Sequence, residues 1–256
     1  MAERSNVIAC RFSNFRPFED RALEWIAAAG LKHVEIMVPP PDCIDATSAE
    51  LRKYGLTASS MHGQCDLQQP DAARQVAGHM PALKALGCRI LFLAVQRDKL
   101  PVETAYERLR HAGDIAAQNG ITIVLETHPD LVTNGDVALE TMRGVNHPNV
   151  RINYDTANVY FYNHNIDSVV EVRKIAPYIA SVHVKDTDGG YRHWHFPALG
   201  EGIVDFPAIF QELDQRGFTG PYTLEIEGIE GEDKTEELVN QRVRDSIAYL
   251  HRLGRC

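Results

Sequence analysis

The sequence lacks several features that would assign it to common classes of protein. No apolar run approaches the roughly 20 residues of a membrane-spanning helix, and the opening residues MAERSNVIAC lack the basic region and apolar core of a secretory signal. The five cysteines (Cys10, Cys43, Cys65, Cys88 and Cys256) show no CxxC spacing, which argues against a zinc ribbon or a disulfide framework. We therefore expect a cytoplasmic protein with reduced thiols.

Basic residues are also too few for a nucleic-acid-binding protein. Lys and Arg number 26 against 35 Asp and Glu, and the formal net charge of -9 repels nucleic acid and anionic membranes. No low-complexity tract or Pro/Gly/Ser linker divides the chain, and 256 residues with 44% hydrophobic content can fill one large core. We expect a single domain over residues 1–256 that binds a small molecule. Its oligomeric state stays open, although self-association is frequent in similar proteins.

Short apolar runs rich in β-branched residues alternate with longer segments that have helical spacing of apolar residues. The predicted strands cover residues 6–10, 33–38, 57–62, 89–95, 121–127, 150–156, 179–186 and 222–228. The predicted helices cover residues 22–30, 48–55, 72–87, 105–120, 137–144, 168–176, 206–217 and 235–254. Several of the helical segments end on a glycine, as helices commonly do (Gly30, Gly55, Gly87, Gly120 and Gly217).

Strict alternation of strand and helix indicates parallel strands, and eight repeats favour an α/β fold closed into a (β/α)8 TIM barrel. An open doubly wound sheet is the alternative. It is disfavoured because no GxGxxG turn follows the first predicted strand.

Ionisable residues stand at the ends of four successive predicted strands, where barrel enzymes place their active sites. They are Glu126, Asp155, His183 and Glu225. Each alone could be a helix cap, a salt-bridge partner or a hydrogen-bonded core residue. Together, three carboxylates and one imidazole would repel one another strongly without a cation. The joint pattern therefore predicts one divalent metal ion, and this mixed oxygen and nitrogen set does not distinguish manganese, magnesium, cobalt and zinc.

Several motifs resemble those of a known family: ITIVLETH, INYDTANVYFYN, ASVHVKD, FPALGEGIVDF and GFTGPYTLEIEG. The chain resembles the xylose isomerase-like barrels, in particular the sugar phosphate isomerase/epimerase family. That resemblance implies the same four metal ligands, with Glu126 and Glu225 moving the proton. Glu227 competes with Glu225 as the last ligand, and the spacing from the preceding GFTG turn favours Glu225.

The predicted activity is a metal-dependent isomerase or epimerase of a sugar or cyclic polyol, acting by proton abstraction next to a carbonyl through a metal-bound enediolate. A dehydratase or lyase on a related keto-sugar is the main alternative. An endonuclease IV-like phosphodiesterase is less favoured, because Asn158 stands where a trinuclear site of that kind would need a histidine. A non-catalytic sugar-binding barrel would be expected to have lost ligands, and all four are present. The ketose 3-epimerases carry a further glutamate after the ligand on the fifth strand, which the segment ETHPDLVTNG lacks.

Other polar residues near the predicted strand ends are candidates for substrate binding, each with a plainer alternative as a surface or salt-bridged residue. They are His62, His128, Asn158, Lys185, His193 and His195. Aromatic residues at 160, 161, 162 and 194 would suit the floor of a sugar site, or would only pack loops. Glu35, in the second strand, would point into the barrel or pair with a helix. No basic cluster for gripping a phosphate stands out, which favours an unphosphorylated substrate.

Overall fold

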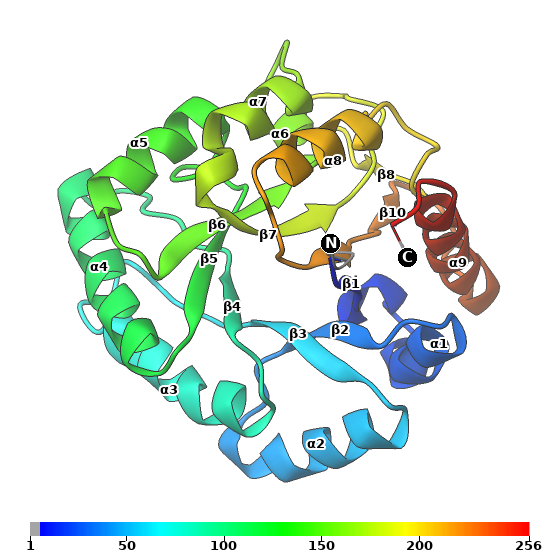
Figure 1. Ribbon diagram of the computed structural model, residues 1–256, viewed down its shortest axis with the longest axis horizontal. Coiled ribbons are helices and arrows are strands. Elements are labelled where there is room, and N and C mark those ends of the chain that lie inside the picture. Colours follow the sequence, from blue (N-terminus) through cyan, green and yellow to red (C-terminus); the bar gives the residue numbers. More distant parts are fainter. Residues whose placement is uncertain (1–5, 256) are drawn as a thin grey trace.

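The computed structural model describes residues 6–255, so the first five residues of the predicted domain and Cys256 lie outside it. Eight parallel strands form a closed barrel, and helices surround it on the outside (Figure 1). The barrel predicted from the alternation of strands and helices is confirmed. Cys10, Cys43, Cys65 and Cys88 are free thiols, as predicted. None of the helices within the described residues is both long enough and apolar enough to cross a membrane.

The barrel strands are β1 (Ile8–Arg11), β2 (His33–Met37), β3 (Thr57–His62), β4 (Ile90–Leu93), β5 (Thr122–Glu126), β6 (Val150–Asp155), β7 (Ile179–Val184) and β9 (Tyr222–Leu224). Each strand pairs in parallel with the next, and β9 pairs with β1 to close the ring. Most strand residues are buried, because the packed interior covers one face and the helices cover the other. The last barrel strand is shorter than the predicted 222–228, since the chain leaves the barrel after Leu224.

The outer helices are α1 (Ala22–Ala28), α2 (Ile44–Lys53), α3 (Ala72–Ala85), α4 (Val102–Gln118), α5 (Gly135–Val145), α7 (Ser168–Ile175), α8 (Phe206–Gln215) and α9 (Glu236–Arg252), with a short α6 (Asn158–Phe161) directly after β6. Asn134, Asp167, Asp205 and Thr235 begin four of them by accepting hydrogen bonds from first-turn amides. All five glycines predicted to follow helix ends have positive φ.

A second, two-stranded sheet was not predicted. β8 (His195–Phe196) pairs antiparallel with β10 (Gly228–Ile229), and so joins the long loop after β7 to the segment after β9. Each of these strands has only two residues, too few to show an alternating pattern in the sequence. The pairing therefore depends on the barrel, which brings the ends of β7 and β9 side by side.

The long loop after β7 is held by one buried carboxylate, Asp186. Its two oxygens accept hydrogen bonds from the backbone amides of Thr187, Gly200, Gly202 and Val204, at 2.8–3.2 Å. Gly202 allows this close approach, because a Cβ at that position would collide with the Asp186 carboxylate. Asp186 thereby fastens both ends of the loop to the end of β7.

Replacing Asp186 by alanine should destabilise the protein, because four backbone donors lose their acceptor. We expect Asp186→Ala to lower the free energy of unfolding by about 3 kcal/mol in urea denaturation, and to speed proteolysis within residues 188–203. Asp188→Ala, an exposed position in the same loop, is the control and should change stability little. Equal stability of the two variants would show that the loop is held by other contacts.

Candidate metal centre

Four side chains meet at the mouth of the barrel, where β5, β6, β7 and β9 end. They are Glu126, Asp155, His183 and Glu225, and one potential ligand atom from each lies within 4.8 Å of the others. All four are buried, with exposed fractions from 0 to 5%. The structure thus brings together the four residues that the sequence pattern selected.

The four residues occupy different positions in the pairing register of their strands. Asp155 is the register partner of His183, whereas Glu126 pairs with Asn153, two residues before Asp155. Glu225 directly follows Leu224, the partner of Val184, and so lies just past the end of its strand. The stagger and tilt of barrel strands let side chains from different register positions converge on one point.

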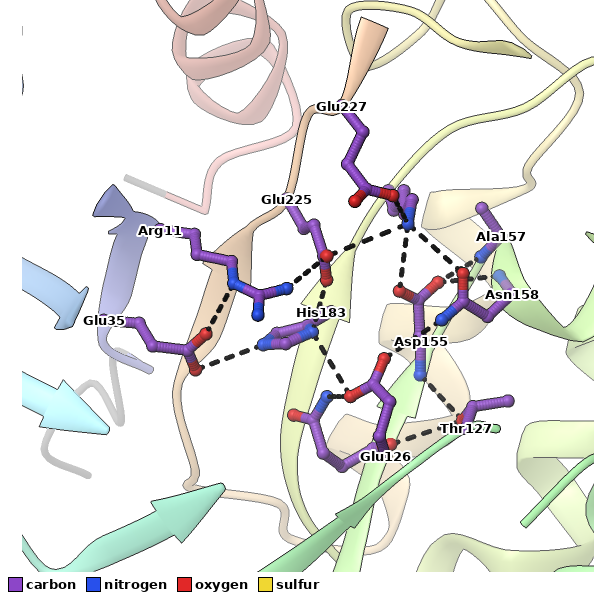
Figure 2. Close-up of polar contacts among 12 residues, drawn as sticks. Arg11, Glu35, Glu126, Thr127, Asp155, Ala157, Asn158, His183, Glu225 and Glu227 are labelled. Carbon is purple, nitrogen blue, oxygen red and sulfur yellow. Dashed lines mark hydrogen bonds and ion pairs between the residues drawn. The ribbon is translucent and has the colours of Figure 1, made fainter. Parts of the chain in front are cut away.

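Asp155 has one oxygen held by the protein and one free. Its Oδ1 accepts hydrogen bonds from the backbone amides of Ala157 and Asn158, both at 2.8 Å, at the start of α6 (Figure 2). Its Oδ2 makes no hydrogen bond to any described residue. The backbone fixes the orientation of the carboxylate and leaves Oδ2 facing the other three ligands.

His183 is oriented by a carboxylate from the far side of the barrel. Its Nε2 lies 3.1 Å from Glu35 Oε2, and Glu35 also accepts from Ser60 Oγ at 2.7 Å and pairs with Arg11 Nε at 3.1 Å. Glu35, 2% exposed, therefore points into the barrel, the first of the two orientations that the sequence left open. A proton on Nε2, donated to Glu35, leaves the Nδ1 lone pair toward Glu225 Oε2 at 2.5 Å and Glu126 Oε2 at 3.5 Å.

Two amide side chains hold Glu126. Asn153 Nδ2 donates to its Oε2 at 2.7 Å, and Asn158 Nδ2 donates to its Oε1 at 3.1 Å. Asn153 in turn accepts from Ser181 Oγ at 2.6 Å. Each carboxylate oxygen of Glu126 keeps further acceptor capacity for a cation or for a proton.

The structure separates the two glutamates that competed for the last ligand position. Glu225 is buried, its Oε1 pairs with Arg11 Nη1, and its Oε2 makes no hydrogen bond to any described residue. The Glu227 side chain is 31% exposed and forms an ion pair with Lys185. Figure 2 shows the Glu225 carboxylate next to His183 and Glu227 farther from it. This arrangement favours Glu225.

The charges around the cluster do not balance unless protons or a cation join them. The buried carboxylates are Glu35, Glu126, Asp155 and Glu225, and the cations between them are Arg11 and Lys185, so a neutral His183 leaves an excess of two negative charges. Glu227 is left out of this balance because solvent screens it. An excess of two charges, together with free atoms on Asp155, His183 and Glu225, fits one divalent cation.

The pKa values of the cluster reflect the same excess of negative charge. Burial, assisted by Glu225 and Glu126 and opposed by Lys185, raises the pKa of Asp155 to about 8. Burial also acts to raise the pKa of Glu225, but Arg11, Lys185 and His183 outweigh it and hold the pKa well below its ordinary value. Burial acts to lower the pKa of His183, but Glu35, Glu225 and Glu126 outweigh it and raise the pKa well above its ordinary value. Without a cation, Asp155 and His183 would therefore both hold a proton near neutral pH, and a bound divalent cation would take the place of these two protons.

A cavity of about 230 Å³ opens above the cluster. Of the predicted substrate-binding residues, four line it: His62, His128, Asn158 and Lys185. Burial lowers the pKa of both histidines, so they face the cavity as neutral hydrogen-bonding groups. His62 lies 3.2 Å from Arg11 Nη2, and His128 lies 2.9 Å from the Tyr162 hydroxyl.

His193 and His195 are not among the residues that line this cavity. Their rings stack on each other with centroids 5.7 Å apart, and His193 pairs with the loop residue Asp188 at 2.7 Å. The alternate residues of the segment, Trp194 and Phe196, line the cavity instead. In an extended segment successive side chains point to opposite sides, so the aromatic pair and the histidine pair cannot both face inward.

Sequence analysis missed Arg11, Asn153 and Phe92. Arg11 joins Glu35 to Glu225, Asn153 holds Glu126, and the Phe92 ring packs 4.8 Å from that of His183. Alternation along a strand would have found Asn153, which lies two residues before Asp155 and on the same face. Arg11 lay one residue beyond the predicted first strand, and its partners come from strands remote in sequence.

Comparisons with known proteins agree with this fold. The family described as "Xylose isomerase-like TIM barrel" matches residues 23–253. The curated relatives include L-ribulose-5-phosphate 3-epimerase UlaE of Shigella boydii, 30% identical over 137 residues that make up 52% of this chain and 46% of the relative. The chain thus spans about half the length of the curated relatives it matches.

Solved structures with similar folds have low sequence identity. D-allulose 3-epimerase from Methylomonas sp. in complex with D-allulose has a TM-score of 0.76 and 20% identity, with 97% of each chain covered. The IolI protein with a bound zinc atom has a TM-score of 0.74 and 19% identity, covering 95% of this chain and 97% of that one. These likenesses support the fold, and the family match over residues 23–253 shows that this chain belongs to the xylose isomerase-like TIM-barrel family.

Proposed function

We propose that this chain is a divalent-metal-dependent sugar isomerase or epimerase that moves a proton at the carbon next to a carbonyl group. The observation that carries the proposal is the buried cluster of Glu126, Asp155, His183 and Glu225 beneath a cavity at the barrel mouth. Family membership and a relative named as a sugar epimerase support the same activity.

Four protein ligands would hold the cation: Asp155 through Oδ2, His183 through Nδ1, Glu225 through Oε2, and Glu126 through a carboxylate oxygen. When bound, a divalent cation supplies Lewis-acid polarisation of the substrate carbonyl, which acidifies the neighbouring C–H group. Manganese, magnesium, cobalt and zinc all suit this ligand set.

The proton transfer falls to Glu126 and Glu225, which both line the cavity and both approach His183 Nδ1. One carboxylate takes the proton from the carbon next to the carbonyl. Return of a proton to the opposite face of that carbon inverts its configuration, and return to the neighbouring carbon gives an isomer. A ligand can act as a base only through an oxygen that keeps a free lone pair. The amides of Asn153 and Asn158 keep Glu126 in one orientation for this step.

Lys185 lines the same cavity. Its Nζ pairs with Glu227 and donates to Asn158 Oδ1 at 3.2 Å. Burial acts to lower the pKa of Lys185, but Glu225, Asp155 and Glu227 raise it above its ordinary value, so the side chain stays charged. Its positive charge therefore favours negative charge that develops on a substrate oxygen in the cavity.

Metal analysis tests the ligand set directly. Wild-type protein purified without chelator should hold about one equivalent of a divalent metal, and Asp155→Ala should hold much less, because the carboxylate with the free oxygen is lost. Asp245→Ala, an exposed position on α9, is the control and should match wild type. Absence of metal from wild-type protein, even after incubation with each of the four ions, would contradict the proposal.

Solvent exchange tests the chemistry. Incubation of metal-loaded wild type with ketoses in heavy water should place deuterium at the carbon next to the carbonyl. Glu126→Gln and Glu225→Gln should lower that rate by at least about 100-fold, because the amide cannot accept the proton. Metal content is measured for each variant, and Glu201→Gln, exposed in the loop after β7, is the control. Product with a lost hydroxyl group would indicate a dehydratase instead, and inertness would indicate a binding protein.

A substitution at Glu35 tests whether its carboxylate orients His183. We expect Glu35→Gln to weaken metal binding by about 10- to 100-fold in calorimetric titration, because an amide orients the imidazole less strongly than a carboxylate. The exposed surface residue Glu24 provides the matched control, Glu24→Gln. Unchanged affinity in Glu35→Gln would mean that packing alone orients His183.

A further inference from the structure

Among the described residues that line the cavity, no Arg or Lys side chain is free to bind a phosphate group. Arg11 and Lys185 are the two Arg or Lys residues among the described residues that line it. Arg11 contacts Glu35 and Glu225, and Lys185 contacts Glu227, with its Nζ also 4.1 Å from the centre of the Phe196 ring. Three carboxylates line the same cavity: Glu126, Glu225 and Glu227. A phosphate dianion in this cavity would therefore find both cations already paired with carboxylates, and it would also lie near the three carboxylates.

Backbone amides in the loop after β7 are also occupied. A glycine-rich loop commonly holds phosphate through its N–H groups, and the loop after β7 contains four glycines. Here Asp186 accepts from Gly200 and Gly202. The amides of Gly189 and Gly190 donate to Thr187 Oγ1 and Asp188 Oδ1. Protein oxygens thus take the donors that a phosphate would need.

Aromatic side chains form the wall on the loop side of the cavity. Phe161, Tyr162, Trp194 and Phe196 all line it. The Trp194 ring meets Phe161 at 90° and Phe196 at 78°, with centroids 6.1 and 5.1 Å apart. The Trp194 backbone is fixed by a hydrogen bond from Glu230 N at 2.9 Å, and its side chain is nevertheless 40% exposed at the rim. Such a ring offers a face to the C–H groups of a sugar.

The size of the cavity limits the ligand. Its volume of about 230 Å³ is below the roughly 300–1,000 Å³ of pockets that bind drug-sized ligands. A cavity of this size suits a ligand smaller than a typical drug, such as a monosaccharide.

We propose that the substrate is an unphosphorylated keto-sugar of monosaccharide size, whose apolar face packs on Trp194 and whose carbonyl end faces the cluster of Glu126, Asp155, His183 and Glu225. This inference rests on the proposed function and narrows its substrate class. It separates the chain from its relative named for a sugar phosphate.

Matched pairs of ketoses test the charge argument. Metal-loaded protein is assayed with L-ribulose against L-ribulose 5-phosphate, and with D-fructose against D-fructose 6-phosphate. We expect kcat/KM for the free sugar of at least one pair to exceed that for its phosphate ester by about 100-fold, because the dianion of the ester finds no unpaired Arg or Lys among the described residues that line the cavity. A phosphate ester turned over as well as or better than its free sugar would overturn the proposal and leave the proposed function intact.

Variants of Trp194 test the aromatic wall. Trp194→Ala should raise KM for the free sugar about tenfold with a much smaller change in kcat, and Trp194→Phe should restore most of the loss. Tyr191→Ala is the control, because Tyr191 lies in the same loop and is 41% exposed but does not line the cavity. Equal effects of the Trp194→Ala and Tyr191→Ala variants would contradict a direct role for Trp194.

If no sugar is turned over, a binding measurement tests the inferred substrate class. Tryptophan fluorescence is titrated with the same sugars, and Trp194→Phe serves as the blank. Tighter binding of a free sugar than of its ester, with a signal lost in the blank, would support the inferred substrate class although the proposed reaction had failed. Binding of neither, or tighter binding of the ester, would overturn the inference.

Discussion

Excess negative charge buried at the barrel mouth is the constraint on which the rest of the site depends. Four carboxylates and one imidazole lie within a space that solvent hardly reaches, and with His183 neutral the two cations leave two negative charges uncompensated. Burial of such a set is costly unless a divalent cation joins it. The free atoms of Asp155, His183 and Glu225 all belong to this cluster. Metal binding and stability of the barrel mouth should therefore be linked in this protein.

The surrounding residues hold the side chains of the cluster in position. Glu35 and Arg11 form a network that connects β1 and β2 with β7 and the end of β9, so the orientation of His183 depends on both halves of the barrel. The amides of Asn153 and Asn158 orient Glu126 from the other side. Asp186, just past His183 and Lys185, holds the loop that carries the aromatic wall. One strand end thus supplies a ligand, a charged wall residue and a loop anchor.

The barrel strands support the family assignment, whereas the loops above the barrel support the proposed substrate class. The ends of the barrel strands carry the cluster of Glu126, Asp155, His183 and Glu225 at the place where barrel enzymes have their active sites, and this cluster supports the proposed proton transfer next to a carbonyl group. The loops above the barrel differ more readily, because insertions there leave the core unchanged. In this chain, backbone amides of the loop after β7 donate hydrogen bonds to Asp186, and Trp194 and Phe196 of the same loop line the cavity. These amides therefore hold the loop in place, and the aromatic rings are the part of the loop that could contact a sugar.

Local pattern alone determined the barrel, its glycine-terminated helices and the four residues of the cluster, because strand alternation and chain order place successive strand ends on one face. Pattern could not determine contacts between segments far apart in the chain. The pairing of Arg11 with Glu225, the support of His183 by Glu35 and the two-residue strands β8 and β10 exist only because closure of the barrel brings β1 beside β9 and β7 beside β9. The outward direction of His193 and His195, with Trp194 inward, likewise followed from where β10 pairs with β8, a long-range contact that leaves no local signal in the sequence.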